Sequence, residues 1–417
     1  MKTIHDCLLV LPGHQIASGD ISYDNGRIAA LALHPVANPT RLVLPGLINC
    51  HGHTPMTLVR GLGAGLPLQD WLEKAIFPVE ARMKPAHIAA GMTWGAMEML
   101  AGGTTCVADM YDFPEAGGAA LRRIGFRAHL CRVGLAFSET EEVPPGRLAE
   151  CVAFVQTGCG VDDLIRRDIS IHSEYLTNER FCRTLAEANK DLKRPIHVHV
   201  SETEREHREC LARHGKTPIA YLAETGLLDF GGYAAHCVYC TDDDFRIMKE
   251  RNVSLVHNPS SNMKLGSGFA RVAKARELGV NVALGTDGCA SNDNLNLFEE
   301  MHLASLIHKG LAHDPTTLSA WDIIDMATVN GARALGRSDI GELAIGKRAD
   351  FCVVDLTRLH LVPCLDAANL IVHSMQASDV VMTVVEGKTL YENGCFTTVD
   401  GEKAKADFLA AVKEIGL

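Results

Sequence analysis

The first informative stretch of the chain is Leu44-Pro45-Gly46-Leu47-Ile48-Asn49-Cys50-His51-Gly52-His53, an apolar run that ends in two histidines. A strand sends residues i and i+2 to the same side, so His51 and His53 leave its end together. Gly52 between them allows the backbone to turn. The pair indicates a metal site, although two solvated loop histidines are the alternative in a chain that carries 19 histidines.

This apolar run is the first of eight, and helical patterning separates most of them, for example over residues 86–100 and 203–214. Alternating strands and helices predict a parallel sheet. Eight units over about 290 residues match a closed (β/α)₈ TIM-type barrel of the α/β class. The predicted strands are Leu47–Cys50, Thr105–Ala108, Arg127–Cys131, Ile169–Ile171, Ile196–Val198, Tyr233–Ala235, Val253–Val256 and Val280–Leu284.

Nearly every predicted strand is followed by a polar, titratable residue. In a parallel barrel these ends meet at one face, where active sites form, so we expect the side chains to converge. For Asp109 and His257 the alternative is that either residue orients a neighbour or holds a loop. The full set is His51, His53, Asp109, Arg132, His172, His199, His236, His257 and Asp287.

The two ends of the chain share a different pattern. Short strands surround a hairpin signal at Asp24-Asn25-Gly26, and similar strands return at 349–355 and 380–385. We therefore expect residues 1–44 and 341–417 to form one small discontinuous β-sandwich domain that includes a C-terminal surface helix. The catalytic barrel would then span residues 45–340.

Composition narrows the class of protein. The 417 residues are 47% hydrophobic and 22% charged, which excludes a disordered or fibrous chain. A net charge of −11 argues against nucleic-acid or anionic-membrane partners and favours a small-molecule substrate. The polar start and the lack of any apolar stretch near roughly 18 residues predict a cytoplasmic protein. The 14 cysteines have no repeated spacing, so we expect reduced, buried thiols.

Six motifs spread along the chain resemble the amidohydrolase superfamily, specifically its methylthioadenosine and S-adenosylhomocysteine deaminase branch. They lie at residues 45–53, 67–72, 197–203, 235–238, 257–265 and 285–288. In that family the two histidines of the first strand, one histidine of the fifth and the aspartate of the eighth hold one divalent metal. The resemblance implies that His51, His53, His199 and Asp287 are the ligands here, and it also suggests a homo-oligomer.

Three imidazoles and a carboxylate suit Zn²⁺, and also Fe²⁺ or Mn²⁺, with an open position for water. Water bound to zinc has a pKa of about 7 and becomes a nucleophile. Glu202 could pass a proton from this water to a ring nitrogen, Asp287 could share proton transfer to the departing ammonia, and His236 could hydrogen-bond the attacking oxygen. A helix N-terminal carboxylate is the alternative for Glu202. Strand alternation makes His197 a packing residue and not a ligand.

The resemblance also implies contacts for a nucleoside. Glu80 matches a glutamate that grips the ribose hydroxyls, His172 a histidine that contacts the base, and Arg132 and Arg147 two arginines that meet an amino-acid carboxylate. A solvated surface arginine is the alternative for Arg147. Three further residues complete the expected substrate contacts: Trp71 as a hydrophobic wall, Glu202 and Ser291.

Two alternatives to an adenosine-type substrate stay open. Glu174 stands where the family usually has a small residue or proline. If its carboxylate points into the pocket, a guanine-like or pterin-like ring becomes more plausible, and related enzymes also hydrolyse triazines. A non-catalytic scaffold with the same barrel is the other alternative, although it would have no physical need for the whole set of ligands and proton-transfer groups.

Overall fold

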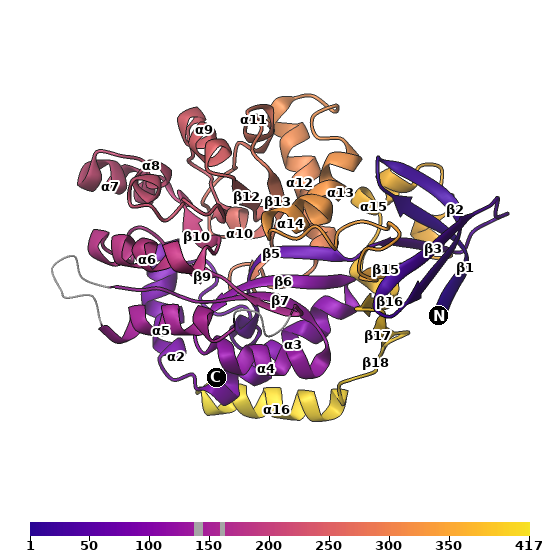
Figure 1. Cartoon of the computed structure of the whole chain (residues 1–417), viewed down its shortest axis with the longest axis horizontal. Coiled ribbons are helices and arrows are strands. Elements are labelled where there is room, and N and C mark those ends of the chain that lie inside the picture. Colours follow the sequence, from indigo (N-terminus) through magenta and orange to yellow (C-terminus); the bar gives the residue numbers. More distant parts are fainter. Residues whose placement is uncertain (137–144, 159–162) are drawn as a thin grey trace.

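The computed structural model describes residues 1–136, 145–158 and 163–417, and its centre is a parallel barrel (Figure 1). The barrel consists of two five-stranded sheets, in the orders β14-β5-β6-β7-β8 and β13-β12-β11-β10-β9. The fourth and eighth barrel strands are each split in two, and their halves belong to different sheets. The (β/α)₈ prediction is confirmed. The strands are β5 (Leu47–His53), β6 (Thr104–Tyr111), β7 (Arg127–Arg132), β8 (Ile165–Arg167), β9 (Ile169–Ser170), β10 (Ile196–Val200), β11 (Gly232–His236), β12 (Val253–His257), β13 (Val282–Leu284) and β14 (Asp287–Gly288).

Burial explains why these runs form barrel strands. Every residue of β5, β6, β10, β11 and β12 is buried, as expected for parallel strands that are covered on both faces. The pairing register aligns the strand ends: His199 lies opposite Ala235, and Asp287 lies opposite Gly52, between the two histidines of β5. The register therefore brings the strand-end side chains to one edge of the barrel.

Helices surround the barrel and fill its connections (Figure 1). They are α1 (Leu68–Asp70), α2 (Phe77–Glu80), α3 (Pro85–Ala101), α4 (Pro114–Ile124), α5 (Pro145–Gln156), α6 (Glu179–Leu192), α7 (Glu204–His214), α8 (Pro218–Glu224), α9 (Asp242–Glu250), α10 (Pro259–Lys264), α11 (Val272–Glu277), α12 (Leu297–Ala312), α13 (Ala320–Ala327), α14 (Val329–Ala334), α15 (Ala367–His373) and α16 (Gly401–Glu414). A π-helical stretch, η2 (Trp71–Ile76), joins α1 to α2. Within the described ranges, none of these helices is both long and apolar enough to cross a membrane.

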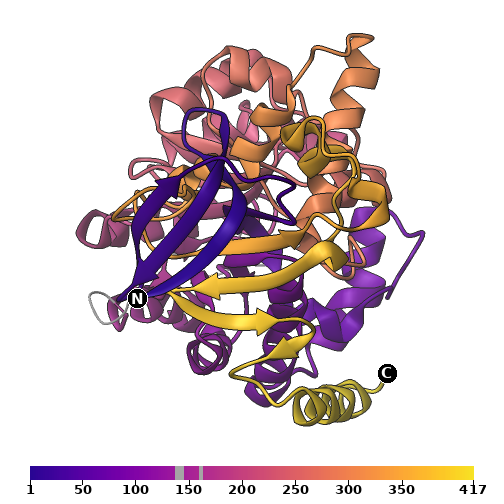
Figure 2. The same cartoon turned by 90° about the vertical axis from the view of Figure 1, so that its right-hand side faces the viewer.

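The two ends of the chain build one mixed sheet beside the barrel (Figure 2). Its order is β18-β17-β16-β15-β4-β1-β2-β3. Tyr23 is on β2 and Phe351 is on β15, and two strands, β4 and β1, lie between them in the sheet. Their ring centroids are nevertheless only 5.2 Å apart. A flat sheet would separate them by roughly 14 Å, so the sheet is strongly bent. The layers expected of a sandwich are therefore two arms of one sheet. Its strands are β1 (Lys2–Leu11), β2 (Gln15–Asp24), β3 (Arg27–Leu33), β4 (Arg41–Pro45), β15 (Phe351–Asp355), β16 (Val380–Val385), β17 (Lys388–Glu392) and β18 (Cys395–Phe396).

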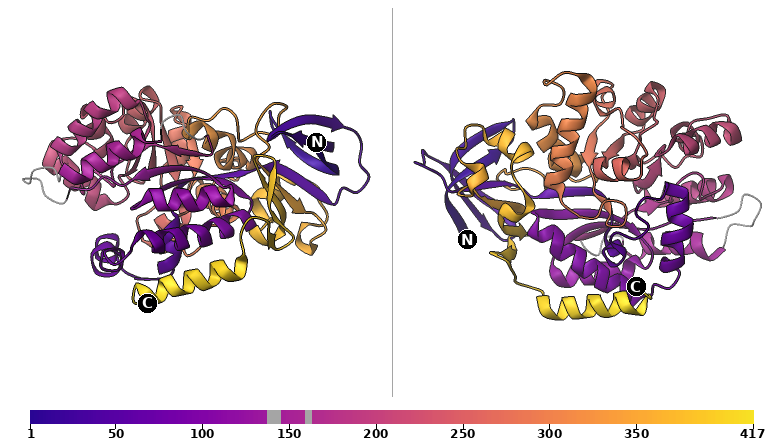
Figure 3. Two further views of the ribbon diagram at one scale, coloured as in Figure 1. Left: turned by 60° about the horizontal axis from the view of Figure 1, so that its bottom comes forward. Right: turned by 180° about the vertical axis from the view of Figure 1, so that it is seen from behind.

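The expected C-terminal helix exists as α16, and it lies along the barrel helix α3 (Figure 3). Phe408 stacks on Trp94 of α3 with 5.1 Å between ring centroids. The helix therefore covers the barrel, and the boundaries proposed for the small domain remain a prediction. The described cysteines are all free and most of them are buried, as expected for reduced core thiols.

Candidate metal centre and active site

Four buried side chains meet at the carboxyl ends of the barrel strands. One ligand atom from each of His51, His53, His199 and Asp287 lies within 4.8 Å of the others. Asp287 Oδ1 is 3.1 Å from His51 Nε2 and 3.2 Å from His53 Nε2. Strands β5, β10 and β14 supply these residues, and they are the four that the family resemblance predicts.

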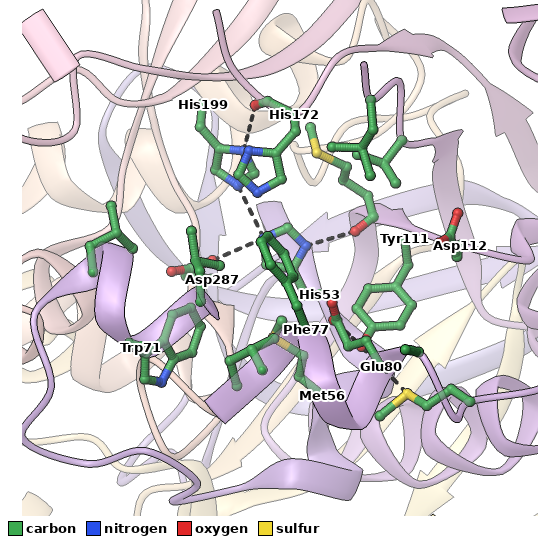
Figure 4. A pocket seen from close by; sticks show the side chains of 18 of the residues that line it. His53, Met56, Trp71, Phe77, Glu80, Tyr111, Asp112, His172, His199 and Asp287 are labelled. Carbon is green, nitrogen blue, oxygen red and sulfur yellow. Dashed lines mark hydrogen bonds and ion pairs between the residues drawn. The ribbon is translucent and has the colours of Figure 1, made fainter. Parts of the chain in front are cut away.

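The hydrogen bonds of His53 and His199 fit a cation between the two rings. His53 Nδ1 lies 2.7 Å from the Met110 carbonyl oxygen, and His199 Nδ1 lies 2.7 Å from the His172 carbonyl oxygen. A carbonyl oxygen only accepts, so each Nδ1 carries a proton, and a ring with no second proton keeps its lone pair on Nε2. These two Nε2 atoms face each other at 3.1 Å (Figure 4). Two facing lone pairs repel, and a proton or a metal ion between them removes that repulsion.

His51 is held in the matching form by His197. His51 Nδ1 is 2.7 Å from His197 Nε2, and His197 Nδ1 is 3.4 Å from the Cys131 thiol. Burial lowers the pKa of His51 to about 4, which keeps its ring neutral. His197 is not among the four grouped residues. It does more than pack, because its Nε2 can accept a hydrogen bond from His51 Nδ1–H, which leaves His51 Nε2 toward the centre.

Two serine hydroxyls orient the carboxylate ligand. Ser261 and Ser291 donate to Asp287 Oδ2 at 2.6 and 2.7 Å, which leaves Oδ1 toward the histidines. Burial alone would raise the pKa of Asp287, but the hydrogen bonds with His51 and His53 outweigh burial and hold that pKa well below its usual range. The substrate contact of Ser291 remains a prediction. Its side chain is buried behind Asp287 and is absent from the described lining of the cavity.

Glu202 lies beside this centre together with His236. Its Oε2 is 3.8 Å from His236 Nε2, and its Oε1 is 3.5 Å from the Ser267 hydroxyl. His236 Nδ1 is 2.9 Å from the side-chain oxygen of Asn262, so Nδ1 carries the proton when the ring is neutral. Burial raises the pKa of Glu202, although the charge of His236 opposes the shift. A carboxyl group with a raised pKa is suited to accept and release a proton near neutral pH.

A cavity of about 400 Å³ opens onto these groups (Figure 4). Its polar wall brings together most of the predicted site residues, and the remainder of the wall is largely apolar. Predicted site residues on the wall are His53, Trp71, Glu80, Arg147, His172, His199, Glu202, His236 and Asp287. The apolar part includes Met56, Leu72, Phe77, Met83, Ile88, Met110, Val133 and Leu265.

Trp71 and Glu80 come from the continuous helical segment that runs from α1 through η2 to α2. The Trp71 indole donates to the Leu62 carbonyl at 3.1 Å, which fixes the ring against the cavity. The Tyr111 hydroxyl donates to Glu80 Oε1 at 2.6 Å. Burial raises the pKa of Glu80, and the bond from Tyr111 opposes that shift. The second carboxylate oxygen of Glu80 has no partner from the described residues within hydrogen-bond distance.

The two arginines differ. Arg147 lies on the cavity wall, where its guanidinium pairs with Asp112, another wall residue. Its predicted place at the pocket is therefore supported over the alternative of a solvated surface arginine. Arg132 is absent from the described wall, because its guanidinium turns to Glu150 at 2.6 Å. The substrate contact of Arg132 therefore remains a prediction.

Three other residues from the sequence analysis, Asp109, His257 and Glu174, are absent from the described cavity wall. Asp109 accepts from the Thr54 backbone N–H at 2.5 Å, so it holds the loop after β5. His257 Nε2 lies 3.3 Å from His308 Nε2, outside the described cavity wall. The carboxylate of Glu174 is buried and pairs with Arg213 of α7, so it does not point into the cavity. This removes the reason to expect a guanine-like or pterin-like substrate from Glu174.

Sequence reasoning did not single out Ser261, Asn262 or Ser267. All three lie in or just after the motif at 257–265, which was available as a signal. Small polar residues directly after a barrel strand are placed to orient catalytic groups. Their individual roles depend on contacts with Asp287, His236 and Glu202 that only the fold brings together.

The fold and the buried histidine-aspartate centre define a class of metal-dependent barrel hydrolases. Residues 42–390 match the amidohydrolase family. The chain therefore belongs to the amidohydrolase family, as the resemblance of its motifs predicts.

The similar proteins within the family have more specific names. A 5-methylthioadenosine/S-adenosylhomocysteine deaminase of Acetivibrio thermocellus is 42% identical over 90% of this chain and 86% of its own length. A 5'-deoxyadenosine deaminase of Methanosarcina acetivorans is 39% identical over 96% and 94%. The crystal structure of an adenosine deaminase from Xanthomonas campestris with bound zinc has a TM-score of 0.92, at 32% identity, covering 99% of this chain and 98% of that one.

Proposed function

We propose that the chain is a metal-dependent hydrolytic deaminase of adenosine-type nucleosides. Its substrates would include S-adenosylhomocysteine, 5′-methylthioadenosine, 5′-deoxyadenosine and adenosine, each converted to the inosine analogue and ammonia. One observation carries this proposal: a single cavity joins the metal ligands and Glu202 to Glu80, a carboxylate with an oxygen available to a ribose. The names of the relatives at about 40% identity support the same substrate class.

His51, His53, His199 and Asp287 would hold one divalent ion, and we propose Zn²⁺. Three nitrogen donors and one carboxylate form a common set for catalytic zinc, and the related adenosine deaminase contains zinc. When bound, such an ion lowers the pKa of water and supplies a strong nucleophile at neutral pH.

Glu202 would carry the proton. The amino-bearing carbon of adenine is a poor electrophile until the neighbouring ring nitrogen is protonated. Glu202 accepts a proton from water and donates it to that ring nitrogen, while oxygen bonds to the carbon. Its raised pKa suits both steps. The C–N bond then breaks, and the hydroxyl added from water gives its remaining proton to the departing amino group and becomes a carbonyl. Asp287, which lies on the cavity wall, shares this transfer.

His236 would stabilise the attacking oxygen. Its Nε2 atom points to the cavity side, 3.8 Å from Glu202, while Asn262 holds Nδ1. A protonated Nε2 can donate a hydrogen bond to an oxygen that gains charge during attack. Electrostatic stabilisation of this kind needs a fixed donor, and the bond to Asn262 supplies that fixation.

The rest of the cavity would bind the nucleoside. Glu80 accepts hydrogen bonds from the ribose hydroxyls, Trp71 supplies an apolar wall, and His172 contacts the base beside His199. The 5′ substituent would extend along the wall toward Arg147 and Asp112. A small-molecule substrate, a homo-oligomeric assembly and a cytoplasmic location without nucleic-acid or membrane partners remain our predictions.

The substitution Glu202→Gln tests this proposal, because an amide cannot shuttle the proton. We expect kcat for adenosine deamination to fall by roughly 10²- to 10⁴-fold while the bound zinc is retained. A Glu204→Gln variant is the matched control, since Glu204 is exposed on the same turn. A well-folded wild-type protein that binds no divalent ion and deaminates no nucleoside would instead support a scaffold role.

A further inference from the structure

A second buried glutamate lies directly behind Glu202. Glu206 is the third residue of α7, and only 2% of it is exposed. Its Oε1 accepts from the Ser201 backbone N–H at 2.7 Å, and its Oε2 accepts from the Glu202 backbone N–H, also at 2.7 Å. Both oxygens of one carboxylate therefore hold two successive backbone groups of the turn that carries Glu202.

This turn needs such support. Strand β10 ends at Val200, so Ser201 and Glu202 have left the ladder that satisfies the backbone of the strand. Ser201 also has a φ of 47°, in the left-handed region that residues other than glycine rarely adopt. Two hydrogen bonds from successive backbone N–H groups to one side chain hold this conformation in place.

Helix capping alone does not explain Glu206. The N-cap residue of α7 is Thr203, and its hydroxyl already accepts from the Glu206 backbone N–H at 3.2 Å. The Glu206 carboxylate instead reaches past the cap to the two residues before it. Those residues connect the metal ligand His199 to the start of the helix, and one of them is the proposed proton carrier.

We propose that Glu206 is a positioning residue that fixes the backbone of Glu202, and with it the place of the Glu202 carboxylate beside His236. This inference rests on the proposed function, because it assigns the role of Glu206 through Glu202. The turn sets the direction in which the Glu202 side chain leaves the backbone, toward Ser267 and His236. A displacement of about 1 Å of a reacting group costs on the order of a hundredfold in rate.

The variant Glu206→Gln tests the inference with little change in size. One acceptor oxygen becomes an amide NH₂, which meets a backbone N–H donor, so one of the two hydrogen bonds is lost. Glu206→Asp is a second variant, because its shorter side chain cannot reach both N–H groups. Glu204→Gln is the matched control on the same turn. The Ser201 carbonyl accepts from Tyr239 N–H at 3.0 Å, and this bond does not involve Glu206, so it should help to keep the loop folded in the variants.

We expect Glu206→Gln to lower kcat on adenosine about tenfold to a hundredfold, with KM and zinc content within twofold of wild type. Glu204→Gln should leave all three unchanged. Crystal structures should show the Glu202 carboxylate displaced from Ser267 in Glu206→Gln, with His199 in place. An unchanged kcat in Glu206→Gln would overturn a positioning role. A fall in kcat accompanied by lower zinc content, a higher KM and lower thermal stability would overturn it as well.

The crystallographic measurement separates this inference from the proposed function. If wild-type protein deaminates no adenosine-type nucleoside, the proposed function fails. The position of the Glu202 carboxylate in Glu206→Gln can still be compared with that in wild type and in Glu204→Gln. A Glu202 carboxylate that stays in place in Glu206→Gln contradicts the inference whatever the substrate is.

Discussion

Replacing Glu80 by glutamine should weaken catalysis on nucleosides that carry ribose hydroxyls. In the structure the Tyr111 hydroxyl donates to Glu80 Oε1, and Glu80 lies on the cavity wall. Glutamine keeps one acceptor oxygen for Tyr111 and turns an amide NH₂ toward the sugar. One charged hydrogen bond is then lost, at about 1.5–3 kcal/mol. This free energy corresponds to a fall of roughly 10- to 150-fold in kcat/KM.

The assay compares adenosine with 2′,3′-dideoxyadenosine, which differ only in the ribose hydroxyls. Glu80→Gln should reduce kcat/KM for adenosine by the full factor and change that for the dideoxy compound by less than threefold. Glu73→Gln is the matched control, because Glu73 is exposed in η2, on the same helical segment. An equal loss on both substrates would refute the ribose-binding role of Glu80.

Three further predictions follow from contacts around the cavity. Ser291→Ala should weaken zinc affinity about tenfold to a hundredfold and leave the nucleoside KM unchanged, and a raised KM with normal zinc affinity would restore its role as a substrate contact. Asp112→Asn should free the Arg147 guanidinium and raise kcat/KM for S-adenosylhomocysteine relative to 5′-methylthioadenosine, and an unchanged ratio measured on both substrates would argue against a carboxylate at Arg147. Burial raises the pKa of Glu202 and the bond from Ser267 lowers it, so activity should fall as pH drops through this pKa. Ser267→Ala should move that acid limb of the kcat/KM profile to higher pH, and a limb that does not move would disprove the assignment.

Much of the fold could be predicted from the sequence because the barrel strands are buried on both faces. Runs such as Ile196–Val198 are apolar throughout or interrupted only by residues that turn out to be buried, so they are visible without periodicity. The regular return of such runs indicates the barrel. The bend of the terminal sheet was not visible, because the contact of Tyr23 with Phe351 joins residues more than 300 positions apart.

The metal ligands could also be predicted, since each directly follows or ends a strand and belongs to a specific motif. The directions of side chains outside the strands could not be predicted from the sequence. Glu174 turns from the cavity because Arg213 of α7 offers a charge partner, and Arg132 turns to Glu150 for the same reason. Ser291 has the residue type of a substrate contact, but the nearby Asp287 carboxylate takes its hydroxyl. Such choices are decided by tertiary partners.

The most direct test of the proposed function is deamination by the zinc-loaded protein. We would measure kcat/KM for S-adenosylhomocysteine, 5′-methylthioadenosine, adenosine and guanine, through the adenine-to-hypoxanthine absorbance change or the release of ammonia. The proposed function predicts turnover of the adenosyl compounds, with the first two preferred, and little activity on guanine. Activity on guanine or another aminated ring, with none on any adenosyl compound, would contradict it.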